Sequence, residues 1–187
     1  MGEEEIYQKL DRAKKIFKIN REMSLEEDWE NPLYRQFFGQ EFKGDPTAYS
    51  SLASDVFRAE IDRNIISIAH EANSLLYNNF YKILKEKSEE EIADIMENIP
   101  LTIDIEKLED KKLKEIAMLH SYVNTLKSLS MEDYKKITLG KAKKEGDIGL
   151  AYVLAGSTEH LLEIQKEQDY IYHKNILIGK LKELKKK

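Results

Sequence analysis

The sequence contains no cysteine and little glycine or proline, with 8 glycines and 3 prolines in 187 residues. Without cysteine, the chain cannot form a disulfide or a thiolate metal site. Scarce glycine and proline argue against a turn-rich sandwich or barrel and favour helices. No stretch approaches the roughly 18 apolar residues of a membrane span. With 41% hydrophobic and 35% charged residues, the composition predicts a globular protein. Since the acidic N-terminal stretch also lacks the apolar core of a signal peptide, we expect a soluble, cytoplasmic protein.

Catalytic and cofactor motifs are also missing from the sequence. We find no phosphate-binding glycine loop, no dinucleotide fingerprint and no nucleophile elbow. His70-Glu71 begins like a zinc-binding H-E-x-x-H, but position 74 is serine. His120 lies on an apolar helical stripe, where a hydrogen-bonded core histidine is expected rather than a metal ligand. We therefore predict no catalytic, metal or cofactor-binding residue, and a protein that is not an enzyme.

The net charge of −5 is unevenly distributed along the chain. Residues 1–140 are acidic overall, and the basic excess lies in residues 141–187, mostly in the lysine-rich last nine. An acidic body does not attract nucleic acid, and a lysine-rich end is typical of a solvated tail. We therefore expect at most weak direct contact with DNA.

Hydrophobic periodicity predicts a mainly α fold, a helical bundle around one long central helix. Apolar residues recur every three or four positions over 3–20 and from about 47 to 87, the longest periodic stretch. Ser88-Glu89-Glu90-Glu91 is a capping-box pattern that predicts a break and a new helix over 89–98. Further helices are predicted over about 105–129 and from Ser130 onward.

The pattern changes after residue 137. Glycines and lysines over 138–149 predict a linker between a helical domain, 1–137, and a small C-terminal domain, 150–187, with a basic tail. In the latter, Tyr170, Tyr172, Ile176 and Ile178 occupy alternate positions in short aromatic and branched runs, which favours strands. The competing interpretation makes 148–168 a last helix, since its spacing is also helical.

Two groups of residues in the first 65 positions are candidates for contacts with a partner. Glu60 and Asp62 point about 200° apart around a helix, so they cannot act together on one substrate. Glu60 and Arg63 are neighbours that form either a surface pair or a bridge to another helix or subunit. The early aromatic cluster that includes Tyr34, Phe37 and Phe38 suits a core or a partner interface equally well.

Much of the chain from about residue 55 onward resembles an archaeal GINS subunit of the class with its helical domain first and its small strand-rich domain last. The resemblance is carried by Glu60-Ile61-Asp62-Arg63 near the start of a long helix and by Tyr81-Lys82-Ile83 at its end. It is also carried by Tyr122, Thr125 and Leu126 in a later helix.

The resemblance implies a non-enzymatic assembly subunit of a DNA replication complex. GINS subunits form a hetero-oligomer through their helical domains and bridge and activate the MCM replicative helicase and a RecJ-like partner. It implies a second GINS-type subunit as partner and a nucleoid-associated location. It also implies partner docking through the small C-terminal domain, for which the candidate residues are Tyr170, Tyr172, Ile176 and Ile178. The alternative is a small helical nucleic-acid-binding subunit of a CRISPR-type effector complex, which requires salt-sensitive binding to RNA or DNA.

Overall fold

The computed structural model describes residues 2–22, 51–144, 146 and 159–186, and for residues 19, 20, 22, 51–63, 141–143 and 159 it describes the backbone alone. The described part is helical. Its elements are α1 (Glu3–Glu22), α3 (Ser51–Asn78), α4 (Phe80–Glu86), α5 (Glu89–Asn98), the 3-10 turn η3 (Ile105–Lys107), α6 (Lys111–Ser128), α7 (Met131–Lys144) and α9 (Glu159–Lys185). The predicted mainly α class is confirmed for these residues.

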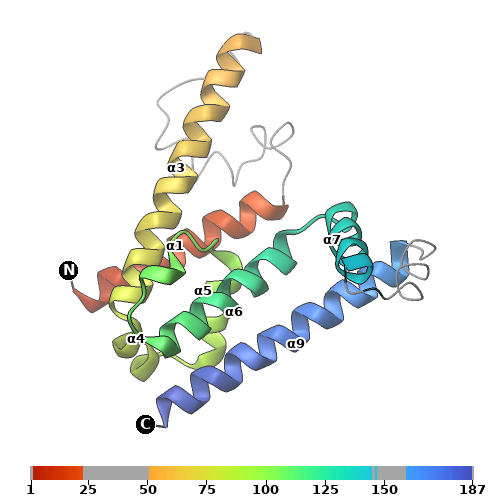
Figure 1. The fold of residues 1–187 in the computed structure, drawn as a ribbon. Coiled ribbons are helices and arrows are strands. Elements are labelled where there is room, and N and C mark those ends of the chain that lie inside the picture. Colours follow the sequence, from red (N-terminus) through yellow and green to blue (C-terminus); the bar gives the residue numbers. More distant parts are fainter. Residues whose placement is uncertain (1, 23–50, 145, 147–158, 187) are drawn as a thin grey trace.

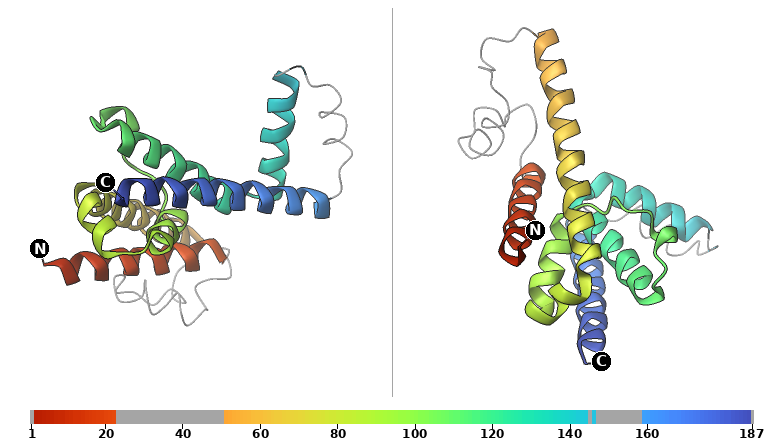
Figure 2. Two further views of the ribbon diagram at one scale, coloured as in Figure 1. Left: turned by 90° about the horizontal axis from the view of Figure 1, so that it is seen from below. Right: turned by 90° about the vertical axis from the view of Figure 1, so that its left-hand side faces the viewer.

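The short helix α5 lies at the centre of the bundle. It contacts α1, α4, α6 and α9, and α1 and α9 pass on opposite sides of it (Figure 2). Six of its ten residues are buried, Ile92, Ala93, Ile95, Met96, Glu97 and Asn98. A helix that is apolar on several faces is stable where other helices cover those faces. The sequence predicted the long helix in this position, whereas the structure places the short one there.

The α5 helix begins where its sequence predicted. The Ser88 hydroxyl accepts from the Glu91 backbone N–H at 3.1 Å, and the Glu91 carboxylate accepts from the Ser88 backbone N–H at 2.9 Å. This capping box satisfies two of the backbone donors that every helix start leaves without partners. Ser130 starts α7 in a similar way, by accepting from the Asp133 backbone N–H at 3.1 Å.

The predicted helix over 47–87 is divided at Asn79 into α3 and α4. The Asn79 side chain donates to the Leu75 carbonyl at 2.9 Å, a local bond that competes with regular helix geometry. Residues before about 65 of α3 extend beyond the other helices (Figure 1). Ala72 and Leu76, later in α3, are buried in the main core, as is Phe80 at the start of α4.

The strand prediction for the C-terminal segment is wrong over 159–185, which form the single helix α9. Tyr170, Tyr172, Ile176 and Ile178 are therefore on helix faces, and residues 150–158 lie outside the described residues. The reason is packing: Leu177 and Leu181 are completely buried against α5 and α6, and such tertiary contacts override strand propensity. Residues 138–144, predicted as linker, belong to α7.

In the part of the chain that the structure describes, no helix is both long enough and apolar enough to cross a membrane.

Candidate functional site: a buried carboxylate beside a basic pocket

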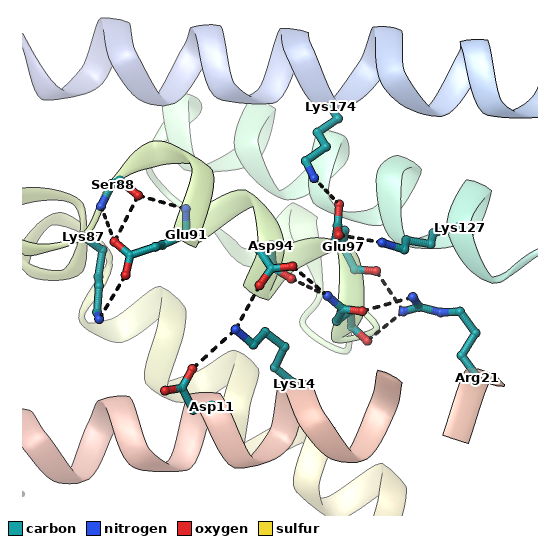
Figure 3. Close-up of polar contacts among 11 residues, drawn as sticks. Asp11, Lys14, Arg21, Lys87, Ser88, Glu91, Asp94, Glu97, Lys127 and Lys174 are labelled. Carbon is teal, nitrogen blue, oxygen red and sulfur yellow. Dashed lines mark hydrogen bonds and ion pairs between the residues drawn. The ribbon is translucent and has the colours of Figure 1, made fainter. Parts of the chain in front are cut away.

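Glu97 in the last turn of α5 is a buried acidic residue, with 2% of its surface exposed. Its carboxylate accepts a hydrogen bond from Lys127 of α6 at 2.6 Å and from Lys174 of α9 at 2.8 Å (Figure 3). The Tyr170 hydroxyl of α9 donates to the same carboxylate. Three donors from two helices therefore meet on one buried anion.

The three donors keep Glu97 ionised. Burial acts to raise the pKa of Glu97, but the hydrogen bonds from Lys127, Lys174 and Tyr170 outweigh it and the pKa is lowered. Burial and the bond to Glu97 together raise the pKa of Tyr170 to about 12. The group is thus a carboxylate with cationic and neutral donors at neutral pH, an arrangement that holds α5, α6 and α9 together.

The carbonyl end of α5 is closed by side chains from two other helices. The Arg21 guanidinium of α1 donates to the Asn98 side-chain oxygen at 3.0 Å and to the Glu97 carbonyl at 3.2 Å. The Asn124 amide of α6 donates to the same carbonyl at 3.0 Å. A helix end leaves its last carbonyls without intrahelical partners and carries partial negative charge, so a guanidinium stabilises it.

A pocket of about 410 Å³ opens beside this group, between the end of α1, the end of α6, the start of α7 and the first half of α9. Arg21, Lys127 and Lys166 supply three cations to its lining, and Glu163 and Glu167 supply two carboxylates. We call it the basic pocket. Leu126, Met131 and Tyr170 are the other described residues of its lining.

A second buried polar group surrounds His120 of α6, which is completely buried. Its Nε2 lies 2.7 Å from the Ile99 carbonyl and its Nδ1 lies 3.0 Å from the Tyr77 hydroxyl of α3. Since a carbonyl only accepts, Nε2 carries the proton and the Tyr77 hydroxyl donates to Nδ1. Burial lowers the pKa of His120 to about 4, so the ring is neutral. The predicted hydrogen-bonded core histidine is confirmed.

A surface patch lies between α6 and α9. Met118 and Tyr122, one turn apart on α6, are 61% and 50% exposed, and Tyr172 of α9 is 63% exposed. The His173 ring lies between the two tyrosines, with centroid distances of 4.4 Å to Tyr122 and 5.1 Å to Tyr172. We call these four residues the α6–α9 patch.

The residues predicted from sequence to bind partners differ in their exposure, and the side chains of some lie outside the described residues. Tyr172 is exposed, while Tyr170 donates to Glu97 and both Ile176 and Ile178 are half-buried. The remaining predictions, on Glu60, Asp62, Arg63, Tyr34, Phe37 and Phe38, concern side chains outside the described residues. Partner binding by these six stays a prediction.

Sequence reasoning missed Glu97, Lys127 and Lys174. One weak signal was available for Glu97, because it stands between Met96 and Ile99 in a stretch rich in apolar residues, although Glu90 and Asp94 lie on its own side of the helix. An acidic residue at such a position requires cationic or hydrogen-bonding partners in the fold. The sequence does not show which lysines they are.

No group of three or more histidine, aspartate or glutamate side chains within the described ranges could hold a metal ion. Comparison with known proteins gives no match for this chain, whether with protein-family models, with curated proteins or with solved structures.

Proposed function

We propose that this chain is a non-enzymatic assembly subunit of a GINS-type replication complex, which joins a second helical subunit and contacts the MCM helicase and a RecJ-like partner. The sequence resemblance supports the replication role. The helical bundle is compatible with it, and the α6–α9 patch is the observation that favours an assembly function.

The α6–α9 patch has the composition of a protein–protein contact. Aromatic residues and methionine are enriched at interfaces, where they bury a large area and lose little conformational entropy. Tyr122 and Tyr172 are both at least half exposed, and both rings contact the His173 ring. Exposed rings that are already ordered lose less entropy on binding than mobile side chains.

The buried polar groups of the molecule support the same proposal. The Glu97 carboxylate is bonded to two lysines and a tyrosine, and His120 has a partner on each ring nitrogen. Groups that are fully occupied within the fold hold helices in place and offer no site for proton transfer to a substrate. Both groups therefore act as structural supports of the bundle that carries the exposed patch.

Affinity purification of the tagged chain from its native cell, followed by mass spectrometry, tests the proposal. We expect a second helical subunit and MCM to co-purify with the intact chain. The double variant Tyr122→Ser/Tyr172→Ser should lose one of them, because it removes the two exposed rings. Leu161→Ser, at the exposed first half of α9, serves as the matched control and should retain both.

Two results would contradict the proposal. One is a chain that stays monomeric by light scattering with neither MCM nor a helical subunit bound. The other is co-purification of RNA and effector subunits, with binding that weakens steeply as salt rises, which would favour the nucleoprotein alternative.

A further inference from the structure

We propose that the basic pocket binds a small organic anion, a carboxylate or phosphate that carries an apolar group, with Lys166 as its main counter-ion. This inference is independent of the assembly function, since it concerns a different surface. It depends on the position of the charges in the pocket, on the partners that each already has, and on the apolar part of the lining.

Charges in the basic pocket differ in their exposure. The cationic side chains Arg21, Lys127 and Lys166 are half-buried, whereas Glu163 and Glu167 are exposed. The two carboxylates are therefore better hydrated, and water screens them more than it screens the three cations. An entering anion is thus attracted more strongly by the cations than it is repelled by Glu163 and Glu167.

The cations differ in what they already bind. Lys127 is ion-paired with Glu97 at 2.6 Å, and the Arg21 guanidinium donates to the carbonyl end of α5. The Lys166 ammonium makes no hydrogen bond and no ion pair with any residue in the described ranges. Of the three lining cations, it is thus the one whose partial burial the described residues compensate least.

The electrostatics of Lys166 agree with this geometry. Burial lowers the pKa of Lys166, and the nearby Arg21 charge lowers it further against the opposing effect of Glu167. A lysine with a lowered pKa is one whose charged form lacks stabilisation. An anion bound beside it would supply that stabilisation and would raise the pKa again.

The other walls of the pocket define the rest of the ligand. Leu126 and Met131 provide an apolar side, and the Tyr170 ring lies next to it. The volume of about 410 Å³ falls within the range of small-molecule sites. An anion with an apolar substituent fits both surfaces, whereas inorganic phosphate would use the cations alone.

Titration of the full chain followed by NMR provides the test, with phenyl phosphate, benzoate, inorganic phosphate and benzylamine as probes. We expect saturable shifts at Lys166 and Tyr170 with phenyl phosphate and benzoate, and none with benzylamine. Lys166→Gln should weaken phenyl phosphate binding about tenfold or more, the loss of one charged contact. Lys166→Arg keeps the charge and should stay within about threefold of the intact chain.

Lys107→Gln is the matched control, because Lys107 is an exposed lysine on η3 and does not line the pocket. It should leave binding unchanged. No saturable binding of either aromatic anion below about 10 mM would overturn the proposal, as would equal affinity in Lys166→Gln and the intact chain. Inorganic phosphate binding as tightly as phenyl phosphate would overturn the role of the apolar wall.

Discussion

Glu97 and His120 are both buried polar residues at the contact between α5 and α6, yet one is charged and the other neutral. Glu97 receives two lysines and a tyrosine hydroxyl, and its pKa is lowered despite its burial. His120 faces a carbonyl and a hydroxyl, and burial lowers its pKa to about 4. The comparison shows that the charge of a buried group depends on its partners: cationic donors preserve ionisation, and neutral partners do not.

Removing the Glu97 carboxylate should have the largest effect on stability. Glu97→Ala leaves Lys127 and Lys174 half-buried without their anion, and we expect a loss of about 3–5 kcal/mol in the free energy of unfolding. Urea denaturation followed by circular dichroism would measure it. Glu115→Ala is the matched control: it removes the exposed ion pair with Lys180 between α6 and α9, and should cost below about 1 kcal/mol. Equal losses in the two variants would contradict a special role for Glu97.

Acid should affect the His120 group before the Glu97 group. The folded-state pKa of His120, about 4, lies below its ordinary value of 6.5, so the unfolded chain binds the proton more tightly. The neutral ring contributes fully to the free energy of unfolding above pH 6.5. This contribution, roughly 3 kcal/mol in total, is lost as the pH falls toward 4. The pKa of Glu97 is also lowered, so acid removes its contribution to stability as well. That loss begins only below the ordinary glutamate pKa of 4.5.

Unfolding free energies measured between pH 7 and pH 4.5 would therefore report mainly on His120. His120→Gln can still donate to the Ile99 carbonyl but does not titrate, and should flatten the pH dependence in this range. A pKa for His120 at or above 6.5 by NMR would show that the ring is not desolvated as described.

Two tyrosine variants should have the smallest effects on stability, and they compare the His120 group directly with the Glu97 group. Tyr77→Phe removes the donor to His120 Nδ1 in a fully buried site, and should cost about 1–3 kcal/mol. Tyr170→Phe removes one of three donors to Glu97, which keeps both lysines, and should cost about 1 kcal/mol or less. Thermal unfolding of the two variants in parallel measures the difference. A larger loss for Tyr170→Phe would show that its hydroxyl is the dominant partner of Glu97.

Helices with local signals could be predicted from the sequence. The start of α5 followed from the Ser88–Glu91 pair, and α1 followed from Ile6, Leu10 and Ala13, which are buried as their spacing indicates. The burial of His120 followed from its place on an apolar stripe. In each case, residues within one or two turns carry the information.

The α9 helix shows why other parts could not be predicted. Alternate aromatic and branched residues at Tyr170, Tyr172, Ile176 and Ile178 indicated strands, but the helical set Tyr170, Lys174, Leu177 and Leu181 contacts α5 and α6 in the structure. Both patterns are present in the same residues, and only the surface of the bundle selects between them. The partners of Glu97 were hidden for the same reason, since they are distant in sequence.

The separation between Glu97 and Tyr170, 73 positions along the chain, has a consequence during synthesis. At about 5–20 residues per second, α5 leaves the ribosome several seconds before the segment that carries Tyr170 and Lys174. Until then the Glu97 carboxylate can remain hydrated, which disfavours burial of the last turn of α5. We therefore expect the nascent chain to keep this side of α5 open, where a chaperone can bind it, until α9 closes over it.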